Sequence, residues 1–176
     1  MNRTKKLIRN VIVLAALIYL LFVCSNLYLS PLSAHKHSEK GIHYGPSEIV
    51  HTENFEKGKY FLCTYDKWVS CNTVKRVLFF FWTFGSQVTG FENDTSKKLA
   101  YGWNMSDGDW KTYGIINDKA ITEVEILLED GKTLYQTEFY DHLFLFTWKD
   151  HDGYLKKISG YDKNGGLIYE DIPGGG

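Results

Sequence analysis

Residues 121–140, ITEVEILLEDGKTLYQTEFY, decide the fold class of this chain. In the first half of this stretch apolar side chains alternate with acidic ones, so Val124, Ile126 and Leu128 share one face of a strand. The dipeptide Asp130-Gly131 follows, and Asp-Gly supplies the positive φ that a tight hairpin turn requires. The stretch therefore predicts two antiparallel strands joined by a short turn.

The same pattern continues to the carboxyl end, where strand candidates are separated by further Asp-Gly and Asn-Gly turns. Residues 143–148 are apolar on both faces, which predicts a central strand. The sequence thus predicts an antiparallel meander of five strands. These candidates are residues 121–128, 134–140, 143–148, 154–161 and 167–169.

The middle of the chain is less regular. Residues 58–65 form a clear strand candidate, and residues 88–91 and 100–103 form shorter ones. Residues 73–84 fit one face of a helix and a buried strand equally well, with the aromatic run favouring the strand. Aromatic residues make up 16% of the chain, a bias typical of strands. We therefore expect a mainly β fold, or an α+β fold.

The amino end carries a membrane signal. A basic cluster, residues 3–9, precedes an uncharged run whose apolar part begins at Val11. As a helix, residues 11–29 would span about 28 Å, close to the hydrocarbon thickness of a bilayer. The positive-inside rule keeps the N-terminus in the cytoplasm and exports the rest. A cleaved signal peptide and a lipoprotein acylated at Cys24 are the alternatives.

The remaining length is that of one domain, large enough for a hydrophobic core. We expect a cell-membrane protein with a single membrane pass and its C-terminal domain outside. Its predicted parts are a cytoplasmic tail (1–9), a transmembrane signal-anchor helix (10–29), a stalk or linker (30–56), a β-rich extracytoplasmic domain (57–172) and a flexible tail (173–176).

Several phrases of the outer domain carry a resemblance to known proteins. They are residues 66–70 (DKWVS), 80–85 (FFWTFG), 88–91 (VTGF), 103–108 (WNMSDG), 113–118 (YGIIND) and 161–165 (YDKNG). In these phrases the chain resembles uncharacterised small membrane-anchored exported proteins of Bacillus-type bacteria. The resemblance covers most of residues 57–170 and implies an exported domain of unknown role. It transfers no catalytic residue.

Two cysteines lie in the expected outer domain. Cys63 and Cys71 are eight positions apart and would face each other across a hairpin if residues 65–68 form its turn. Outside the cytoplasm such a pair can form a disulfide, worth about 2–3 kcal/mol on the chain-entropy model. Two reduced, buried thiols are the alternative, and the sequence leaves both open.

Four residues are candidates for a binding site. Trp68 and Trp110 stand in polar company, so they are the best surface candidates among the five tryptophans. Asp107 and Asp109 flank Gly108, where two carboxylates could contribute to binding or to acid–base chemistry. A solvated polar turn is the simpler interpretation of this acidic pair.

Other functional classes find little support. His35, His37 and His43 could converge on a metal ion, but they stand without acidic or cysteine partners, so neither metal nor cofactor is predicted. The net charge of −1 provides no basic field for nucleic acid beyond the cluster at the membrane segment. The chain carries no motif of a hydrolase nucleophile, a zinc protease or a phosphate loop.

The sequence therefore predicts a membrane-anchored, extracytoplasmic binding or interaction module of unknown ligand, more consistent with a non-catalytic protein than with an enzyme. One alternative is a small hydrolase of envelope material that uses Asp107, Asp109 or His142. A cleft that brings carboxylate and histidine together would favour the hydrolase. Another alternative is an accessory subunit of a membrane complex.

Overall fold

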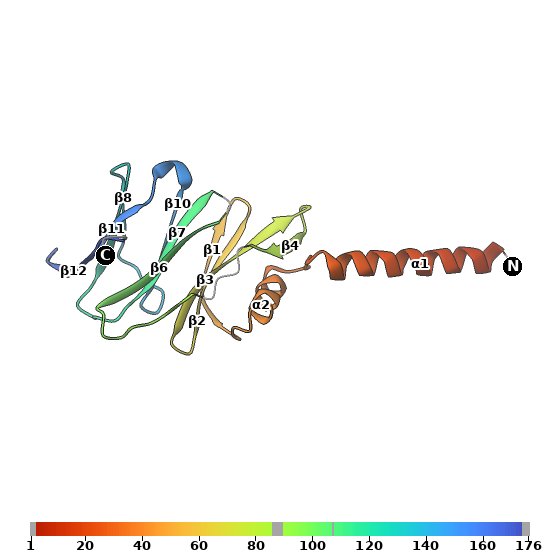
Figure 1. The fold of residues 1–176 in the computed structure, drawn as a ribbon, viewed down its shortest axis with the longest axis horizontal. Coiled ribbons are helices and arrows are strands. Elements are labelled where there is room, and N and C mark those ends of the chain that lie inside the picture. The colour runs from red at the N-terminus through yellow and green to blue at the C-terminus, as the bar shows by residue number, and fades with distance from the viewer. Residues whose placement is uncertain (1–2, 86–89, 107, 174–176) are drawn as a thin grey trace.

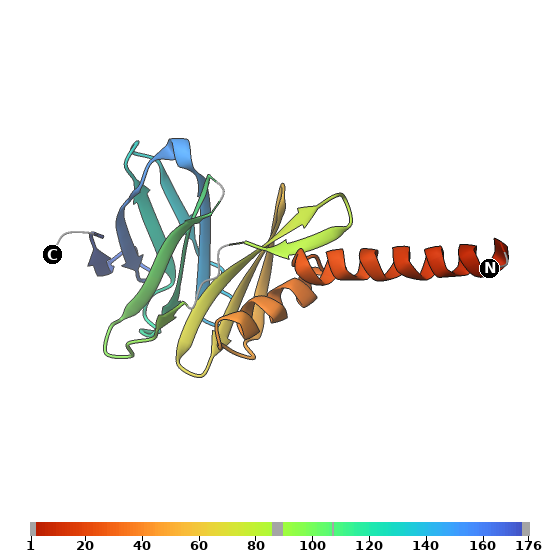
Figure 2. The ribbon, with the colours of Figure 1, turned by 45° about the vertical axis from the view of Figure 1, so that its right-hand side comes forward.

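The computed structural model describes residues 3–85, 90–106 and 108–173, with the backbone alone for residues 21–24. Three antiparallel sheets and one short helix stack as four layers, and a long helix projects from one end (Figures 1 and 2). The prediction of a mainly β fold with antiparallel sheets is confirmed.

The first sheet lies against the short helix α2 (Pro31–Gly41). Alternate side chains of its strands point to opposite faces, so Cys63 and Val74 pack toward α2. Leu62 and Cys71 pack toward the next sheet. The strand order is β1-β2-β3-β4, with β5 beside β3. The strands are β1 (Glu48–Phe55), β2 (Gly58–Tyr65), β3 (Trp68–Val77), β4 (Phe81–Phe84) and β5 (Phe91–Glu92).

The second sheet is the middle layer of the domain. Its order is β10-β7-β6, with β6 (Leu99–Ser106), β7 (Asp109–Ile116) and β10 (Leu143–Lys149). Tyr113 and Leu143 pack toward the first sheet. Phe144 and Phe146 pack in the opposite direction, against the third sheet. This sheet is therefore apolar on both faces.

The third sheet has the order β12-β11-β8-β9. Val124, Ile126 and Leu128 are buried on its inner face, as their alternation predicts. Gly131 takes φ +90° in the turn after β8, so the Asp-Gly hairpin is confirmed. The elements of this layer are β8 (Glu123–Leu128), β9 (Thr133–Gln136), the short helix η1 (Asp150–Asp152), β11 (Leu155–Tyr161) and β12 (Leu167–Asp171).

The predicted five-strand meander is wrong in one strand. The chain makes the β8–β9 hairpin, leaves for β10 in the middle sheet, and returns to pair β11 with β8. The apolar character of residues 143–148 on both faces suits this detour, because the middle sheet is covered on both sides, whereas the third sheet packs against another layer on its inner face. β10 is consequently an edge strand of a sandwiched sheet, and not the central strand that we expected.

Residues 73–84, which the sequence left between helix and strand, form a hairpin. β3 ends at Val77, which pairs with Phe81 at the start of β4. The strand preference was therefore correct, although the aromatic run contains a turn as well. The strand candidate at residues 88–91 falls mostly outside the described residues, and β5 begins at Phe91.

The projecting helix is α1 (Arg3–Cys24), which ends earlier than the predicted segment 10–29. Tyr28 already belongs to the domain, since its N–H donates to the carbonyl of Trp82 at 2.7 Å and its carbonyl accepts from the Trp82 N–H at 2.8 Å. Within the part of the chain that the structure describes, no helix combines the length and the hydrophobicity needed to cross a membrane.

Residues 30–56, expected to be a stalk, fold onto the domain as α2 and β1. Ser30 caps α2 by accepting a hydrogen bond from the Ser33 N–H, and Pro31 occupies the first turn. The side that α2 buries is largely polar and includes His35, Ser38 and Glu39. A helix that buries polar side chains shows no apolar periodicity, which explains why the sequence pattern did not reveal it.

The two cysteines of the domain are free thiols. β2 and β3 do form the hairpin that a disulfide would need, but Cys63 pairs with Ser70, and Cys71 pairs with Leu62. This offset of one residue places the two thiols on opposite faces of the sheet. The structure therefore favours the alternative of two reduced thiols, because side chains that point apart cannot be bridged.

This arrangement predicts the behaviour of the thiols in solution. With Cys24 replaced by serine, the folded protein should resist a maleimide reagent, because both remaining thiols are buried. Both should react after unfolding in urea without any reductant, as counted by intact mass. A protein that takes up label only after reduction would instead contain the disulfide.

Candidate functional site

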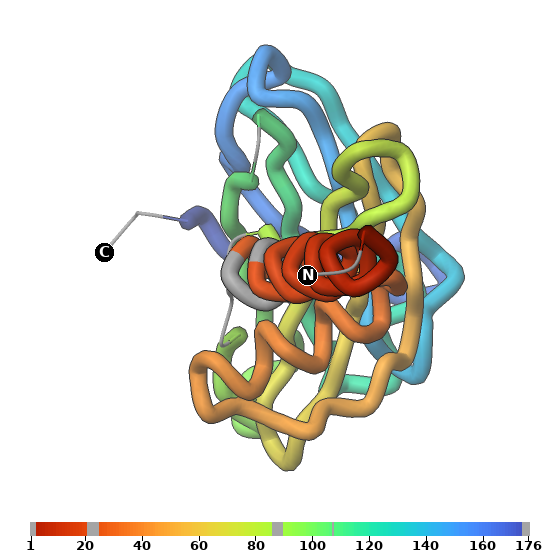
Figure 3. Tube along the Cα trace, turned by 90° about the vertical axis from the view of Figure 1, so that its right-hand side faces the viewer, coloured from red at the N-terminus to blue at the C-terminus, as the bar shows by residue number. Residues whose placement is uncertain are grey.

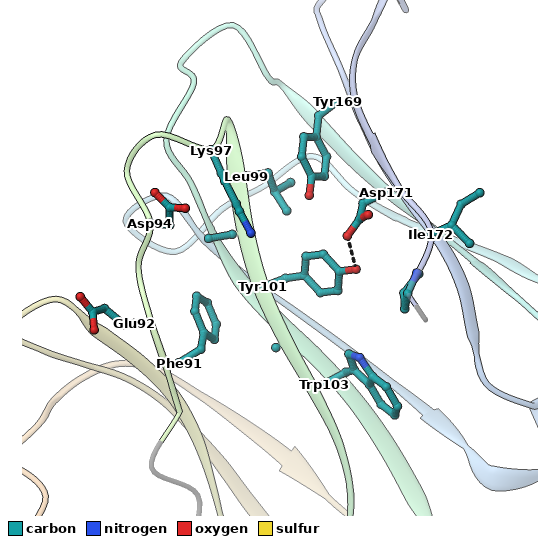
Figure 4. A pocket seen from close by; sticks show the side chains of 13 residues that line it. Phe91, Glu92, Asp94, Lys97, Leu99, Tyr101, Trp103, Tyr169, Asp171 and Ile172 are labelled. Carbon is teal, nitrogen blue, oxygen red and sulfur yellow. Dashed lines mark hydrogen bonds between the residues drawn. The ribbon is translucent and has the colours of Figure 1, made fainter. Parts of the chain in front are cut away.

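A groove of about 590 Å³ lies where the edge strand β6 meets β12 and β5 (Figure 4). β6 contributes one wall through alternate side chains on its inner face, Tyr101 and Trp103. The third sheet leaves this stretch of β6 partly uncovered, so the Trp103 ring remains 47% exposed. The groove thus runs around the exposed edge of β6, because Phe91 packs against Gly102 on one face of this strand while Tyr101 and Trp103 point to the other face.

Aromatic rings from three strands line the groove. Phe91 comes from β5, Tyr101 and Trp103 from β6, and Tyr169 from β12 (Figure 4). Gly102 allows Phe91 to approach β6, since a Cβ at this position would lie 2.9 Å from the Phe91 ring. The faces of such rings are flat and apolar. The negative part of the ring quadrupole lies on these faces, so they also attract cations.

One hydrogen bond connects the two walls. The Tyr101 hydroxyl donates to the Asp171 carboxylate at 2.7 Å (Figure 4). Burial raises the pKa of Tyr101, and the Asp171 hydrogen bond and negative charge raise it further. The phenol therefore stays protonated as a donor, and it holds one Asp171 oxygen in a fixed position.

The ionisable side chains of the groove are mainly acidic. Glu92, Asp94 and Asp171 line it, against a single cation, Lys97. Glu92 is also paired with Lys67 at 2.6 Å. Hydrogen bonds from Ser96 lower the pKa of Asp94, so this carboxylate is ionised at neutral pH. The groove consequently combines aromatic faces with negative charge.

The loop that carries Asp94 and Lys97 is held in place by side-chain amides. Asn93 and Asn117 donate to each other at 3.0 Å in both directions. The Asn117 amide also donates to the carbonyls of Asp94 and Lys97. The position of this charged wall is therefore fixed by the fold.

Behind the groove, Trp103 is supported by a row of rings. Its centroid lies 5.5 Å from that of Trp110, and the Trp110 ring stacks on Trp148 at 6.3 Å. The Trp110 indole N–H donates to Asp150 at 2.9 Å, which fixes the orientation of the ring. The row connects the exposed Trp103 to the core between the second and third sheets.

The structure separates the residues that the sequence singled out. Trp110 is only 7% exposed, so it is a core residue and not the surface residue that we expected. Trp68 is half-buried on β3 and does not line this groove. Asp109 pairs with Lys149 at 2.7 Å. Asp107 lies outside the described residues.

The hydrolase alternative expected a carboxylate and a histidine in one cleft. His142 lines a depression with Phe139 and Thr122, whereas Asp109 lines a separate one with Lys132 and Asp152.

The groove residues Tyr101, Trp103 and Asp171 were missed by sequence reasoning. The alternation of Tyr101, Trp103 and Met105 along one strand face was the available signal for the first two.

A second polar cluster lies beneath α2. The buried ring of His35 has its Nε2 3.3 Å from the Glu39 carboxylate, 3.4 Å from the Ser47 hydroxyl and 3.8 Å from the Cys63 sulfur. Ser47 also donates a short hydrogen bond to Glu39. Burial raises the pKa of Cys63 to about 12, so the sulfur is a protonated thiol and a poor nucleophile. The cluster therefore holds α2 on the sheet.

Lys111 is buried between the first two sheets. Its ammonium donates to the Thr73 hydroxyl at 2.8 Å and to the Cys71 carbonyl, and it lies 5.1 Å from the centroid of the Tyr60 ring. Burial lowers its pKa. Lys111 follows Trp110 in β7, where alternation predicts that a polar side chain points to solvent. The sequence pattern therefore gave no sign that this lysine is internal.

Within the described residues 3–85, 90–106 and 108–173, no group of three or more His, Cys, Asp or Glu side chains is placed to hold a metal ion. His35 is directed into the cluster beneath α2, and the His37 ring stacks on Tyr28 at 4.7 Å. The two histidines have different partners and do not converge on one point.

The cluster beneath α2 predicts a pH dependence of stability. Burial lowers the pKa of His35, and the Glu39 charge only partly opposes this shift. Below about pH 6.5 the unfolded chain therefore binds a proton more readily than the folded one, and folding is weakened as pH falls. Urea unfolding at pH 7.5 and pH 5 should show this loss, and His35→Gln should reduce it. An equal pH dependence in both proteins would contradict the assignment.

In comparisons with known proteins, no family model, no curated protein and no solved structure matches the chain.

Proposed function

We propose that the protein is a non-catalytic binding module, tethered to the cell membrane by its N-terminal segment, and that its groove binds a ligand that carries an amine or guanidinium group. The observation that carries the proposal is the groove at β6 and β12, which combines four aromatic rings with three carboxylates. The strands β6 and β12 that line it lie in the part of the domain remote from α1 (Figures 1 and 2).

The tether is supported by the surface of α1. Large apolar side chains are exposed around the helix, from Leu7 to Leu20. Each such side chain would gain about 1.5–3 kcal/mol on leaving water, so lipid is a far better environment for α1 than solvent. At 1.5 Å per residue, the 22 residues of α1 measure about 33 Å, of which the uncharged residues 10–24 account for about 22 Å.

The charges of α1 set its orientation in this proposal. Its cations are confined to the first turns, at Arg3, Lys5, Lys6 and Arg9. Long cationic side chains extend to the headgroups while their stems remain in lipid, so these turns belong at the membrane surface. The N-terminus would then be cytoplasmic and the β domain outside, in agreement with the positive-inside rule.

The ligand class follows from the chemistry of the groove. An ammonium or guanidinium group gains from the face of Trp103 and from the fixed carboxylate of Asp171 together. Asp94 adds negative charge at the loop wall. An anionic ligand would be repelled by the same groups. A cation-binding groove is therefore the function that this arrangement supports best.

Calorimetric titration of the full-length protein in non-ionic detergent micelles tests the proposal. Pentalysine and a glucosamine trimer present the same ammonium group on a peptide and on a sugar, and pentaglutamate is the control. We expect saturable binding of at least one cationic probe, weakened by salt. The tighter probe identifies the source of the ammonium group. Equal binding of pentaglutamate, or binding of neither cationic probe, would refute the proposed function.

Matched variants place the binding in the groove. Trp103→Ala should weaken binding at least about tenfold, as expected for a central aromatic contact. Tyr135→Ala removes an exposed ring on β9 that lies outside the groove and should leave binding unchanged. Asp171→Asn should weaken binding, whereas Glu170→Gln, one residue earlier, should not. Equal effects of the two variants in either pair would show that the ligand binds outside the groove.

A further inference from the structure

The turn between β3 and β4 exposes three consecutive large apolar side chains. Leu78 is 64% exposed, Phe79 94% and Phe80 64%. We refer to Leu78, Phe79 and Phe80 as the hairpin tip. A run of exposed apolar residues at a turn is unfavourable in water, and it marks a surface that contacts something else.

The backbone of the hairpin tip is also unsuited to these residues. Leu78 has φ +49° and Phe79 has φ +66°, the left-handed region in which Gly, Asn and Asp are preferred. The turn is short, because the flanking residues Val77 and Phe81 are paired. Folding alone would favour a sequence such as Asn-Gly here. Bulky apolar residues that oppose the local preference indicate a role at the surface rather than in folding.

The hairpin tip lies beside the domain-proximal end of α1. The hydrogen bonds between Tyr28 and Trp82 attach the segment that follows α1 to β4, the strand that begins immediately after the tip. In Figures 1 and 2 the hairpin extends toward the side from which α1 projects. Viewed along α1, the yellow-green hairpin is next to the red helix (Figure 3). A bilayer that receives α1 would therefore meet the hairpin tip as well.

The surroundings of the hairpin tip suit the surface of a bilayer. Arg76 is exposed on the strand that leads to the tip, and its guanidinium lies 5.1 Å from the centroid of the buried Trp82 ring. Leu29 and Leu32, which follow α1, are exposed too. In the interfacial region of a bilayer a cation such as Arg76 reaches the headgroups, while apolar side chains enter the acyl boundary.

We propose that the hairpin tip inserts into the lipid interface beside α1, as a second membrane contact of the domain. This inference rests on the proposed tether. A single helix followed by a short connection would let the domain rotate and tilt against the membrane. A second contact at Phe79 and Phe80 removes this freedom and holds the groove in a fixed direction, away from the lipid.

Spin labels on the full-length protein in phosphatidylcholine vesicles test the inference. In a Cys24→Ser background the buried Cys63 and Cys71 remain unlabelled. Single labels are placed at Phe80→Cys in the tip, at Leu17→Cys in α1 and at Asn164→Cys in the turn before β12. Electron paramagnetic resonance then compares collision with oxygen, which concentrates in lipid, and with a water-soluble nickel chelate.

We expect oxygen to dominate at positions 17 and 80, and nickel to dominate at position 164. If position 80 behaves as position 164 does while position 17 is in lipid, the second contact is refuted and the tether stands. If position 17 is also in water, the tether fails, and the inference fails with it.

A variant separates membrane contact from folding. Leu78→Asn together with Phe79→Gly supplies the residues that the turn prefers, so the hairpin should fold at least as well. The loss of one Phe side chain from lipid alone should reduce the inserted population of the tip about tenfold. Position 80 should consequently become accessible to nickel. Tyr135→Ser, on β9, is the matched control and should leave position 80 in lipid. An unchanged position 80 in the double variant would refute the inference.

Discussion

Trp110→Ala should lower the free energy of unfolding by about 3–5 kcal/mol, the range for deletion of a large buried aromatic ring. Trp110 is a core residue whose ring contacts Trp103, Trp148 and Tyr154. Its removal also leaves the Asp150 carboxylate without the indole donor. Urea unfolding of the full-length protein in mild detergent, followed by circular dichroism, measures the loss.

Trp103→Ala is the matched control for this variant. The Trp103 ring is about half exposed at the groove, so its removal should cost much less stability while it weakens ligand binding. The two tryptophans thus separate folding from binding. If Trp110→Ala lost binding but kept its stability, Trp110 would be the surface residue that its polar sequence neighbours indicated.

Phe144→Ala should be comparably severe, with a loss of about 3–5 kcal/mol. Phe144 is fully buried in the middle sheet and packs against the third sheet. A Cβ on Gly114 of the neighbouring strand would overlap its ring, which shows how little free space surrounds it. Thr147→Ala is the control, because Thr147 is exposed on the same strand.

The same urea titration measures both variants. The stacked arrangement of three sheets requires a large difference between them, since Phe144 is fully buried against the third sheet whereas Thr147 is exposed. Similar midpoints for Phe144→Ala and Thr147→Ala would contradict a sandwiched middle sheet.

The local elements of this fold could be predicted because they depend on neighbours in sequence. Strand β2 and the hairpin turn at Gly131 follow from alternation and from turn chemistry. The exit of β10 from the third sheet could not be predicted in detail. Two apolar faces show that a strand is covered on both sides, but not which sheet it joins.

The helix α2 and the groove show a different limit. α2 buries His35 and Glu39, whose partners Ser47 and Cys63 are remote in sequence, so no periodic pattern announces the contact. The groove assembles side chains from β5, β6 and β12. Asp171 becomes a candidate only when the fold places it against Tyr101, 70 positions earlier. Sites built between layers depend on long-range pairing that a single sequence does not encode locally.

The proposed tether at the amino end and the proposed ligand groove make up the central claim, a tethered module with its β domain outside the cell membrane. Asn164→Cys in a Cys24→Ser background provides the most direct measurement, because residue 164 is exposed in a turn and the other thiols are buried. The account predicts that a membrane-impermeant maleimide labels the protein on intact cells, and that the labelled protein sediments with the membranes. Labelling that requires cell lysis, or labelled protein in the soluble fraction, would contradict it.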